Sequence, residues 1–329
     1  MDLSTAEATL EHAIATLAPV GEVERRRALV IVNPHATTVS ERLRSLVIYA
    51  LAARYAVEAI ETQRQGHATE LARQASGERF DLVVALGGDG TVNEAANGLV
   101  GTDVPLTCLP GGSANVYCKL LGIPGEIVDA TEHLLRMADR FAPRRVALGL
   151  VEDRHYLFSA GVGLDADVVR RVDAHPALKR RFGPYFFVGV AMATLLRHYA
   201  VGAPRMFVAV GGETLAGVTA IVQKGEHYTY FHDRPIDLAE GATLDGGTLS
   251  GVVLRRASLA AVPSLATRAM LRRARVTRHR QVSAFTDAAA LTVSSAAGRS
   301  LPLQVDGDYI GQVTEARFHV RPAALTVVA

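Results

Sequence analysis

The succession of short apolar strands and helices over residues 26–142 constrains the fold of this chain more than any other feature. Ala28 to Val32 is wholly apolar and rich in β-branched residues, as expected of a buried parallel strand. Asn33-Pro34 interrupts it, and apolar residues at helical spacing follow. The same succession returns around strands predicted at 55–61, 81–86 and 105–109. Strands that alternate with helices indicate βαβ units, so we predict an α/β fold with a parallel sheet.

The pattern changes after Pro143. Short alternating segments separated by glycine turns, such as 144–151, 206–210 and 301–305, are typical of an antiparallel sheet. Helical stretches near 166–200 and 257–275 interrupt them. A length of 329 residues is in keeping with two domains. We predict an α/β domain at 26–142 and an antiparallel β-rich domain at 143–329, whose last strand is a candidate to return to the first domain.

Residues 1–25 are predicted to form a helical extension. Ser4 and Glu7 have the spacing of a capping box. Thr38 and Glu41, at the start of the next predicted helix, have the same spacing. We expect the apolar stripe of the extension to pack against this chain or across a homodimer.

Composition excludes several classes of protein. Hydrophobic residues make up 49% and charged residues 21%, which is ordinary for a globular protein with a core and unlike a disordered or fibrous chain. The longest apolar stretch, Tyr185 to Leu196, is shorter than the ~20 residues of a membrane-spanning helix. The start of the chain lacks the basic region of a secretory signal. With only two cysteines and no metal-binding spacing, we expect a cytoplasmic protein.

The strongest local motif is the glycine-rich turn at 87–90. It follows a predicted buried strand directly, and a helix is predicted from Thr91. Glycines let a ligand approach the backbone, and a helix N-terminus offers free N–H groups to phosphate. Asp89 would add a carboxylate able to hold Mg²⁺ near phosphate oxygens. A tight strand-to-helix turn with a polar tip explains the spacing equally well.

A second glycine-rich turn, Pro110 to Asn115, follows the next strand. Asn33 and Thr62 stand at two further strand ends. In open α/β sheets, ligands bind beyond the carboxyl ends of the strands. Two such loops on successive strands therefore favour a ligand site over a purely structural turn.

These motifs carry a resemblance to a known family. GGDGTVNEAANGL at 87–99, PGGSAN at 110–115 and LGIP at 121–124 resemble the diacylglycerol kinase catalytic-domain superfamily, which includes soluble bacterial lipid kinases, sphingosine kinases and ceramide kinases. GGDGT alone also occurs in NAD kinases and phosphofructokinases, but its combination with PGGSAN is more specific. The resemblance extends to QVDGD at 304–308. It implies a nucleotide-binding domain of the NAD-kinase and phosphofructokinase type, a β-rich lipid-substrate domain, and an active site between them.

The resemblance also implies which residues bind ATP. Carried over by position, they are Asn33, Thr62, Gly87, Gly88, Asp89, Gly90, Thr91, Asn93, Glu94, Gly111, Gly112, Ser113 and Asn115. Most relatives have threonine where Ser113 stands, so the hydroxyl is retained. Mg²⁺ bound with ATP would be held by Asp89.

The late Asp306-Gly307-Asp308 sequence has two interpretations. Locally it is a hairpin turn, for which Asp-Gly is a favoured dipeptide. Relatives have Asp-Gly-Glu here, with the final carboxylate proposed as the proton acceptor. Asp308 reaches about one methylene less far than glutamate, so the resemblance leaves the catalytic base open between Asp308, Asp306 and Asp89.

A second departure from the family concerns a structural Mg²⁺ site near a D-D-G-x-[LF] motif. Here Asp245 stands one residue early, and Gly246 occupies the place of the second aspartate. Asp245 is the remaining candidate ligand, and we do not expect this site to be filled.

Basic residues precede aromatic ones in the predicted helical stretch near 166–200. Arg170, Arg171, Lys179, Arg180 and Arg181 come before Phe182, Tyr185, Phe186 and Phe187. Each cation near an anionic bilayer contributes about 1 kcal/mol, so this segment predicts peripheral membrane association. A core helix with a solvated basic loop is an equally weighted alternative. We expect no nucleic-acid partner.

Together these observations predict an ATP- and Mg²⁺-dependent lipid kinase that converts diacylglycerol to phosphatidic acid. Three alternatives stay open at this point: a sphingosine- or ceramide-type lipid kinase, an NAD-kinase-like enzyme, and a catalytically weak nucleotide-binding regulator. The last is suggested by the departures at Asp308 and Gly246.

Overall fold

A computed structural model describes residues 3–17, 25–36, 38–199, 204–231, 234–271 and 274–329. The chain forms two compact units, Met1–Val146 with Ala323–Ala329 and Ala147–Pro322. Two strands, β5 and β18, run from one unit into the other, because their residues lie on both sides of these limits.

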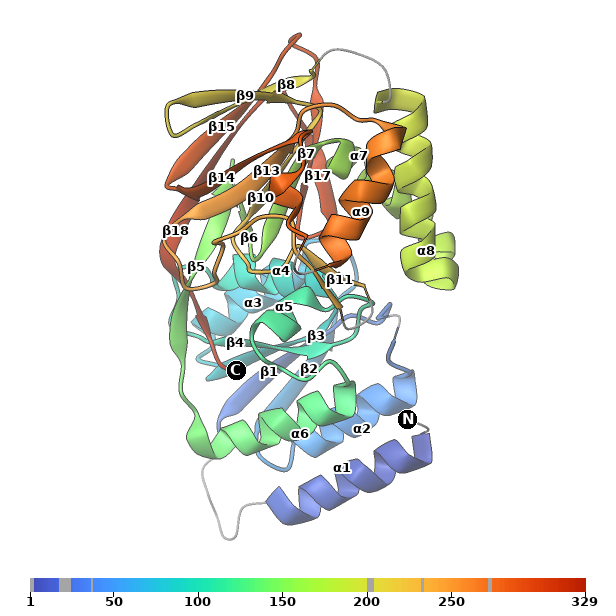
Figure 1. The fold of residues 1–329 in the computed structure, drawn as a ribbon. Helices are drawn as coiled ribbons and strands as arrows, with labels where there is room; N and C mark the ends of the chain where they lie inside the picture. Colours follow the sequence, from blue (N-terminus) through green and yellow to red (C-terminus); the bar gives the residue numbers. More distant parts are fainter. Residues whose placement is uncertain (1–2, 18–24, 37, 200–203, 232–233, 272–273) are drawn as a thin grey trace. The chain divides into compact units, whose positions relative to one another are not determined.

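The first unit is a parallel α/β sheet with helices on both faces (Figure 1). Strands β2, β1, β3 and β4 lie in that order and are parallel, and Val327 of β18 pairs with Leu106 of β4 in the same direction. Its elements are α1 (Leu3–Leu17), β1 (Arg27–Val32), α2 (Glu41–Leu51), β2 (Ala56–Glu61), α3 (His67–Gly77), β3 (Leu82–Gly87), α4 (Asp89–Leu99), β4 (Leu106–Pro110), α5 (Val116–Leu120), α6 (Ile127–Met137) and a 3-10 turn (Ala138–Arg140).

Burial explains this order of layers. Strands β3 and β4 are buried along their whole length, as their near-continuous apolar sequences predict. Helices α3 and α4 pack together on one face, and α2 and α6 cover the other. The α3–α4 contact is close: a Cβ at Gly98 would lie 2.5 Å from the carbonyl oxygen of Thr69. Only glycine allows the two backbones to approach so closely.

The N-terminal helix α1 packs against α2 and α6 of its own chain, with Ala6, Leu10 and Ala13 buried. The side chains of Ser4 and Glu7 lie outside the described residues. The cap of α2 differs from our expectation: its N-cap is Ser40, whose hydroxyl accepts the N–H of Leu43 at 3.3 Å, rather than Thr38. Thr38 and Ser40 both carry a hydroxyl group near the start of this helix. The extended backbone of Ser40, directly before the helix, makes Ser40 the N-cap.

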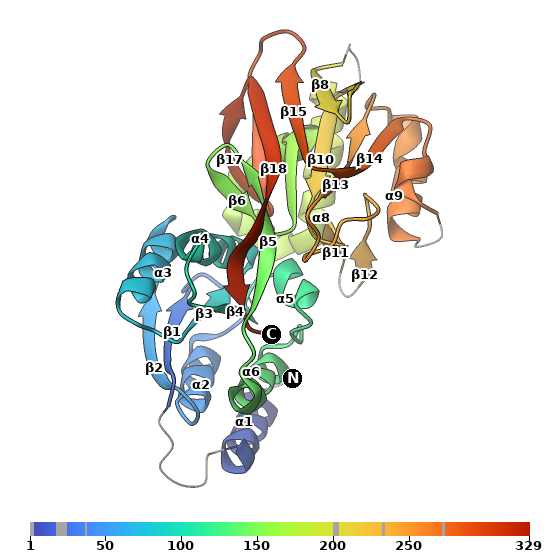
Figure 2. The same cartoon turned by 90° about the vertical axis from the view of Figure 1, so that its left-hand side faces the viewer.

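The second unit packs two sheets face to face (Figure 2). Its elements are β5 (Arg144–Val151), β6 (Arg154–Tyr156), β7 (Ser159–Gly163), α7 (Leu164–Asp173), α8 (Pro176–Thr194), a π-helical turn (Leu195–Tyr199), β8 (Met206–Val210), β9 (Glu213–Gly217), β10 (Thr219–Gln223), β11 (Thr229–Phe231), β12 (Arg234–Ile236), β13 (Leu249–Leu254), a 3-10 turn (Leu259–Ala261), α9 (Val262–Met270), a 3-10 turn (Val276–Arg278), β14 (Val282–Ala288), β15 (Ala290–Ser295), β16 (Leu301–Val305), β17 (Asp308–Val313) and β18 (Glu315–Val327).

One sheet of this unit has the order β18-β15-β8-β9, and the other β14-β13-β10-β7-β16-β17. Neighbouring strands in both are antiparallel. Alternate residues of the two sheets, among them Val162, Val208 and Phe318, form a shared core. Helix α7 packs on β7, β16 and β17, and α8 packs on α7.

The predicted fold class is therefore confirmed: a parallel α/β sheet is followed by an antiparallel β-rich part. In the part of the chain that the structure describes, no helix has both the length and the apolar character needed to cross a membrane.

Candidate active site

The predicted nucleotide-binding residues gather at the carboxyl edge of the parallel sheet. Val32, the last residue of β1, pairs with Glu61 of β2 and Leu86 of β3, and Gly87 pairs with Pro110 of β4. Asn33, Thr62 and both glycine turns follow these strand ends directly. The Asn33 amide donates to Thr91 Oγ1 at 3.0 Å and so connects the end of β1 to the start of α4.

The two glycine turns pack backbone against backbone. The N–H of Gly111 donates to the carbonyl oxygen of Gly87 at 2.9 Å. A Cβ at Gly112 would lie 2.7 Å from the Cα of Gly88, which no real side chain tolerates. At Gly88, by contrast, a Cβ would lie 3.4 Å from Gly112, an ordinary contact. The structural need for glycine is therefore greater at Gly112 than at Gly88.

Helix α4 begins immediately after this contact. Its N-cap is Gly88, which has no side chain with which to accept the first N–H groups. Uncapped N–H groups at a helix N-terminus carry a partial positive charge and bind phosphate oxygens. The edge of the sheet thus presents donors that suit a nucleotide phosphate.

Asp89 is held by the neighbouring helix. Its Oδ2 accepts the N–H of Val116 and its Oδ1 the N–H of Tyr117, both at 3.0 Å, so the carboxylate caps α5. Burial raises the pKa of Asp89, and the two N–H groups and the Lys119 charge oppose this rise. Each carboxylate oxygen keeps a second lone pair, so the residue fits a Mg²⁺ ligand that is already oriented.

Three further predicted ATP residues also make hydrogen bonds inside the fold. Asn115, with φ of 47°, accepts the N–H of Gly112 and donates to its carbonyl, both at 2.8 Å. Glu94 accepts the N–H groups of Gly66 and Ala68 and so caps α3. Asn93 is fully buried and accepts from the Asn97 amide. Ser113, by contrast, is exposed at the tip of its loop.

Asp306 and Asp308 belong to the second unit and meet different surroundings. The buried Asp306 carboxylate accepts three backbone N–H groups, from Leu157 at 2.7 Å and from Phe158 and Ser159 at 3.0 Å. The carboxylate of Asp308 accepts no hydrogen bond from the described residues. Burial raises the pKa of Asp308 to about 7, with Asp173 adding to the rise and Lys179 opposing it.

Two backbone carbonyl groups just before Asp245 bond to a cationic side chain of this chain. The fully buried ammonium of Lys224 donates to the carbonyl oxygens of Thr243 at 2.6 Å and Leu244 at 2.7 Å. Burial lowers the pKa of Lys224 to about 8, and the Asp245 charge opposes this fall. Among the described residues, no three His, Cys, Asp or Glu side chains gather as metal ligands. One carboxylate near the charge of an ammonium does not fit Mg²⁺, so we derive no catalytic step from a metal at Asp245.

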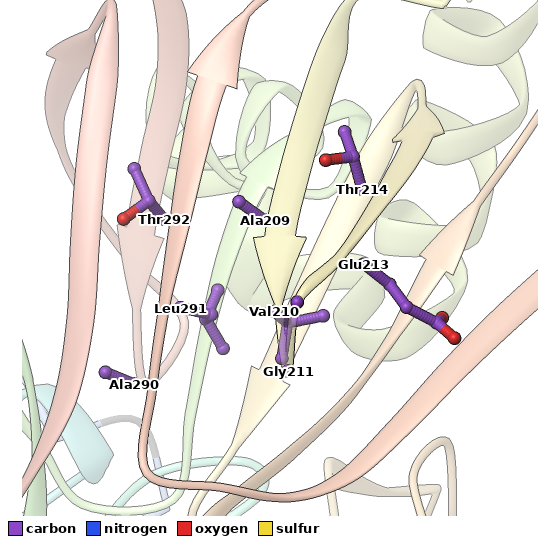
Figure 3. A pocket seen from close by; sticks show the side chains of 9 residues that line it. Ala209, Val210, Gly211, Glu213, Thr214, Ala290, Leu291 and Thr292 are labelled. Atoms are coloured by element: carbon purple, nitrogen blue, oxygen red, sulfur yellow. The ribbon is translucent and has the colours of Figure 1, made fainter.

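A hollow of about 320 Å³ lies in the second unit, between the β8–β9 hairpin and β15 (Figure 3). Val210, Thr214 and Leu291 line it, and Glu213 is the one charged residue on its wall. The hollow contains none of the predicted site residues.

Sequence reasoning missed Lys224 and a group of polar side chains beneath the Asp306–Asp308 turn. In that group Asp165 accepts from the hydroxyl of Tyr228 and from the amide of Gln304. Asp165 lies in the first turn of α7, just after β7, where no predicted strand pointed to it. Tyr228 gave no signal, and although Gln304 stands in the QVDGD sequence, nothing there indicated its partner Asp165, which is distant in the chain.

Comparisons with known proteins agree with this geometry. Residues 27–142 match the diacylglycerol kinase catalytic domain. A diacylglycerol kinase of Bacillus subtilis is 27% identical over 299 residues, which cover 88% of this chain and 91% of that protein. An uncharacterized protein of Synechocystis sp. is 37% identical over 122 residues, or 36% of this chain, and the match spans only 27% of that protein.

Solved structures share the fold over nearly the whole chain. A diacylglycerol kinase from Bacillus anthracis has a TM-score of 0.65 at 17% identity and covers 93% of this chain and 98% of its own. A second structure from that organism has a TM-score of 0.70 at 21% identity and covers 94% of this chain and 96% of its own.

The parallel sheet with glycine turns at its carboxyl edge suits a nucleotide-dependent phosphotransferase. Residues 27–142 are a diacylglycerol kinase catalytic domain, and the chain is, by class, a lipid kinase.

Proposed function

We propose that this lipid kinase transfers the γ-phosphoryl group of ATP to the free hydroxyl of diacylglycerol, giving phosphatidic acid. The observation that carries the choice of acceptor is the match over 91% of the Bacillus subtilis diacylglycerol kinase, which includes the β-rich part as well as the nucleotide-binding part. The kinase catalytic domain at residues 27–142 implies that ATP is the phosphoryl donor.

In this proposal the edge of the parallel sheet holds the nucleotide. The N-terminus of α4 and the backbone of the Gly111–Gly112 turn bind phosphate oxygens, and Asn33 and Thr62 border the same edge. Mg²⁺, held by Asp89 and the phosphates, would offset negative charge on the transferring group. Asp89 is already oriented by Val116 and Tyr117, so binding the ion would require little rearrangement of this side chain.

We assign the proton acceptor to Asp308 rather than to Asp306 or Asp89. Three backbone N–H groups bond to the Asp306 carboxylate and occupy three of its lone pairs, so they compete with a proton for this side chain. Asp89 is bonded to two N–H groups of α5. Asp308 has no such bonds among the described residues, and a pKa of about 7 suits a group that accepts a proton at neutral pH.

The decisive experiment is turnover with ATP, Mg²⁺ and a lipid panel. We expect phosphorylation of diacylglycerol in mixed micelles, with Asp308→Asn at least 100-fold slower and with unchanged ATP affinity, because general bases contribute about 10²–10⁴-fold. Faster turnover of sphingosine or ceramide would change the acceptor, and phosphorylation of NAD would contradict the lipid assignment. ATP binding without turnover of any acceptor would indicate a regulator.

We further propose that α8 contacts an anionic membrane. Phe182, Tyr185 and Val188 are 50%, 69% and 55% exposed, and the Arg181 guanidinium lies 5.4 Å from the Phe182 ring centre. Exposed apolar side chains beside cations suit a lipid interface. The side chains of Pro176, Arg180 and Pro184 lie outside the described residues.

Vesicle sedimentation tests this surface. We expect binding to vesicles that contain phosphatidylglycerol, weaker binding at high salt, and loss of binding in an Arg181→Glu, Tyr185→Ser double variant. A matched double variant at Glu213→Gln and Thr214→Ser, on the β8–β9 hairpin, should bind like the wild type. Equal binding to phosphatidylcholine vesicles, or none to either, would contradict the proposal.

A further inference from the structure

A polar cluster lies beneath the turn that carries Asp308, and the mechanism above does not use it. The Tyr228 hydroxyl donates to Oδ1 of Asp165, and the Gln304 amide donates to Oδ2 at 2.7 Å. Gln304 is 1% exposed. Burial raises the pKa of Asp165, while the two hydrogen bonds oppose this rise. A buried amide bonded to a carboxylate in this way needs a reason, because polar groups are costly to bury.

The other end of the Gln304 amide explains it. Its Oε1 accepts the N–H of Gly307 at 2.9 Å, so one side chain joins the Asp165 carboxylate to the tip of the turn. The carboxylate needs a donor and the N–H group needs an acceptor. A primary amide offers both, glutamate offers only acceptors and methionine offers no N–H donor.

The adjacent strand leaves room for this junction. Gln304 pairs with Gly161 of β7 across the sheet. A Cβ at Gly161 would lie 1.9 Å from Asp165 Oδ2 and 2.8 Å from Gln304 Nε2. Any side chain at Gly161 would therefore displace the carboxylate from the amide.

The turn itself is held on both sides. Asp306 and Gly307 have φ of 49° and 85°, and Val305 pairs with Asp308, which defines a two-residue hairpin loop with left-handed central residues. Asp306 is bonded to the backbone of residues 157–159, and Gly307 is bonded to Gln304. Asp308 comes next and begins β17.

We infer that Gln304 is a positioning residue for Asp308: its amide, oriented by Asp165, fixes the turn so that the partly buried Asp308 carboxylate stays directed for proton transfer. The inference rests on the proposed role of Asp308 as base. A substitution of Gln304 should therefore slow catalysis only when Asp308 is present. A residue with a merely structural role would not show this dependence on Asp308.

A double-mutant cycle tests this dependence. Gln304→Met keeps the length of the side chain but removes both amide bonds. We expect kcat to fall at least tenfold with an unchanged KM for ATP. In the Asp308→Asn background the same substitution should cost less than twofold. Equal losses in both backgrounds would overturn the inference.

Tyr228→Phe is the matched control, because it removes the other hydrogen bond to Asp165 and leaves the Gln304–Gly307 bond intact. We expect kcat within threefold of the wild type. A loss as large as that of Gln304→Met would assign the effect to Asp165 in general and overturn the specific role of Gln304. Thermal unfolding checks that each variant is folded.

Two further measurements keep the test decisive. If Gln304→Met does not fold, Gln304→Asn is used, because its shorter amide reaches only one of the two partners. If the wild type phosphorylates no lipid, the proposed function fails, and carbon-detected NMR titration of Asp308 then tests the positioning alone. We expect the pKa of Asp308 to fall by at least one unit in the Gln304 variant as the turn opens to water, and an unchanged pKa would overturn the inference.

Discussion

At the scale of single residues, three carboxylates that the sequence could not rank have distinct surroundings. Asp306 accepts three backbone N–H groups, Asp89 accepts two, and Asp308 accepts none from the described residues. Hydrogen bonds to a carboxylate lower its pKa, whereas burial without them raises it. The roles that we propose for these three aspartates thus differ because of the hydrogen bonds they accept, not because of residue type.

This contrast predicts the pH dependence of turnover. With Asp308 as the proposed proton acceptor, which must be ionised and whose pKa is about 7, kcat should rise roughly tenfold per unit below pH 7 and level off above it. Burial is the main cause of this raised pKa; the charges of Asp173 and Asp306 raise it further, and those of Lys179 and Arg154 lower it. Asp173→Asn removes the charge that raises it and should move the inflection to lower pH. An inflection that stays in place in this variant would contradict the assignment.

At the scale of elements, the two glycine turns depend on each other. The Gly87–Asp89 turn and the Gly111–Gly112 turn touch through backbone atoms, and their contact sets the start of α4 and the edge that would receive phosphate. A position in such a motif can require glycine because a ligand approaches it or because the neighbouring turn packs against it. The distances from a Cβ built at each glycine distinguish these two causes.

We predict opposite outcomes for two alanine substitutions in these turns. Gly112→Ala places a Cβ 2.7 Å from the Gly88 Cα and should lower the unfolding free energy by about 1–3 kcal/mol, as overpacking does. Gly88→Ala, the matched control, meets only an ordinary contact and should change stability by less than about 0.5 kcal/mol. If phosphate lies against Gly88, the same variant should still weaken ATP binding. Denaturant unfolding and ATP titration measure both effects, and equal stability of the two variants would contradict the packing argument.

At the scale of the whole molecule, one buried cation supports the fold of the second unit. Lys224 follows β10 and donates to the carbonyl oxygens of Thr243 and Leu244, in the loop that leads to β13. A buried charge is costly unless it is paired, so the two carbonyl oxygens and the ammonium need each other.

Lys224→Met should therefore destabilise the protein by about 2–4 kcal/mol, because it leaves polar groups unpaired. Lys179→Met, which breaks only the exposed pair with Asp173, should cost at most about 1 kcal/mol.

Burial lowers the pKa of Lys224 to about 8, so between pH 8 and 10.5 the unfolded chain binds the proton that the folded chain has lost. The wild type thus gains stability over this window, and the difference from Lys224→Met should grow with pH. A difference that shrinks would contradict this sign.

Much of the fold was predictable because its signals are local. Buried β-branched runs predicted the strands of the parallel sheet, and alternating segments predicted the antiparallel part, since periodicity reports which faces are buried. The residues at the strand ends were predictable for the same reason, because parallel strands bring their carboxyl ends to one edge. The error at α2, where Ser40 rather than Thr38 is the N-cap, shows the limit of this local reading.

By itself, the sequence determined the fold class, the glycine turns at one edge of the sheet and the Asp-Gly hairpin at Asp306. Each depends on neighbours within a few residues or on the period of an element. Only the tertiary structure decided that Asp89 caps α5, that Lys224 bonds to residues near Asp245, and that Gln304 joins Asp165 to the turn before Asp308. These contacts link residues up to 139 positions apart, and burial, which sets their strength and the pKa values around them, exists only once the chain has folded.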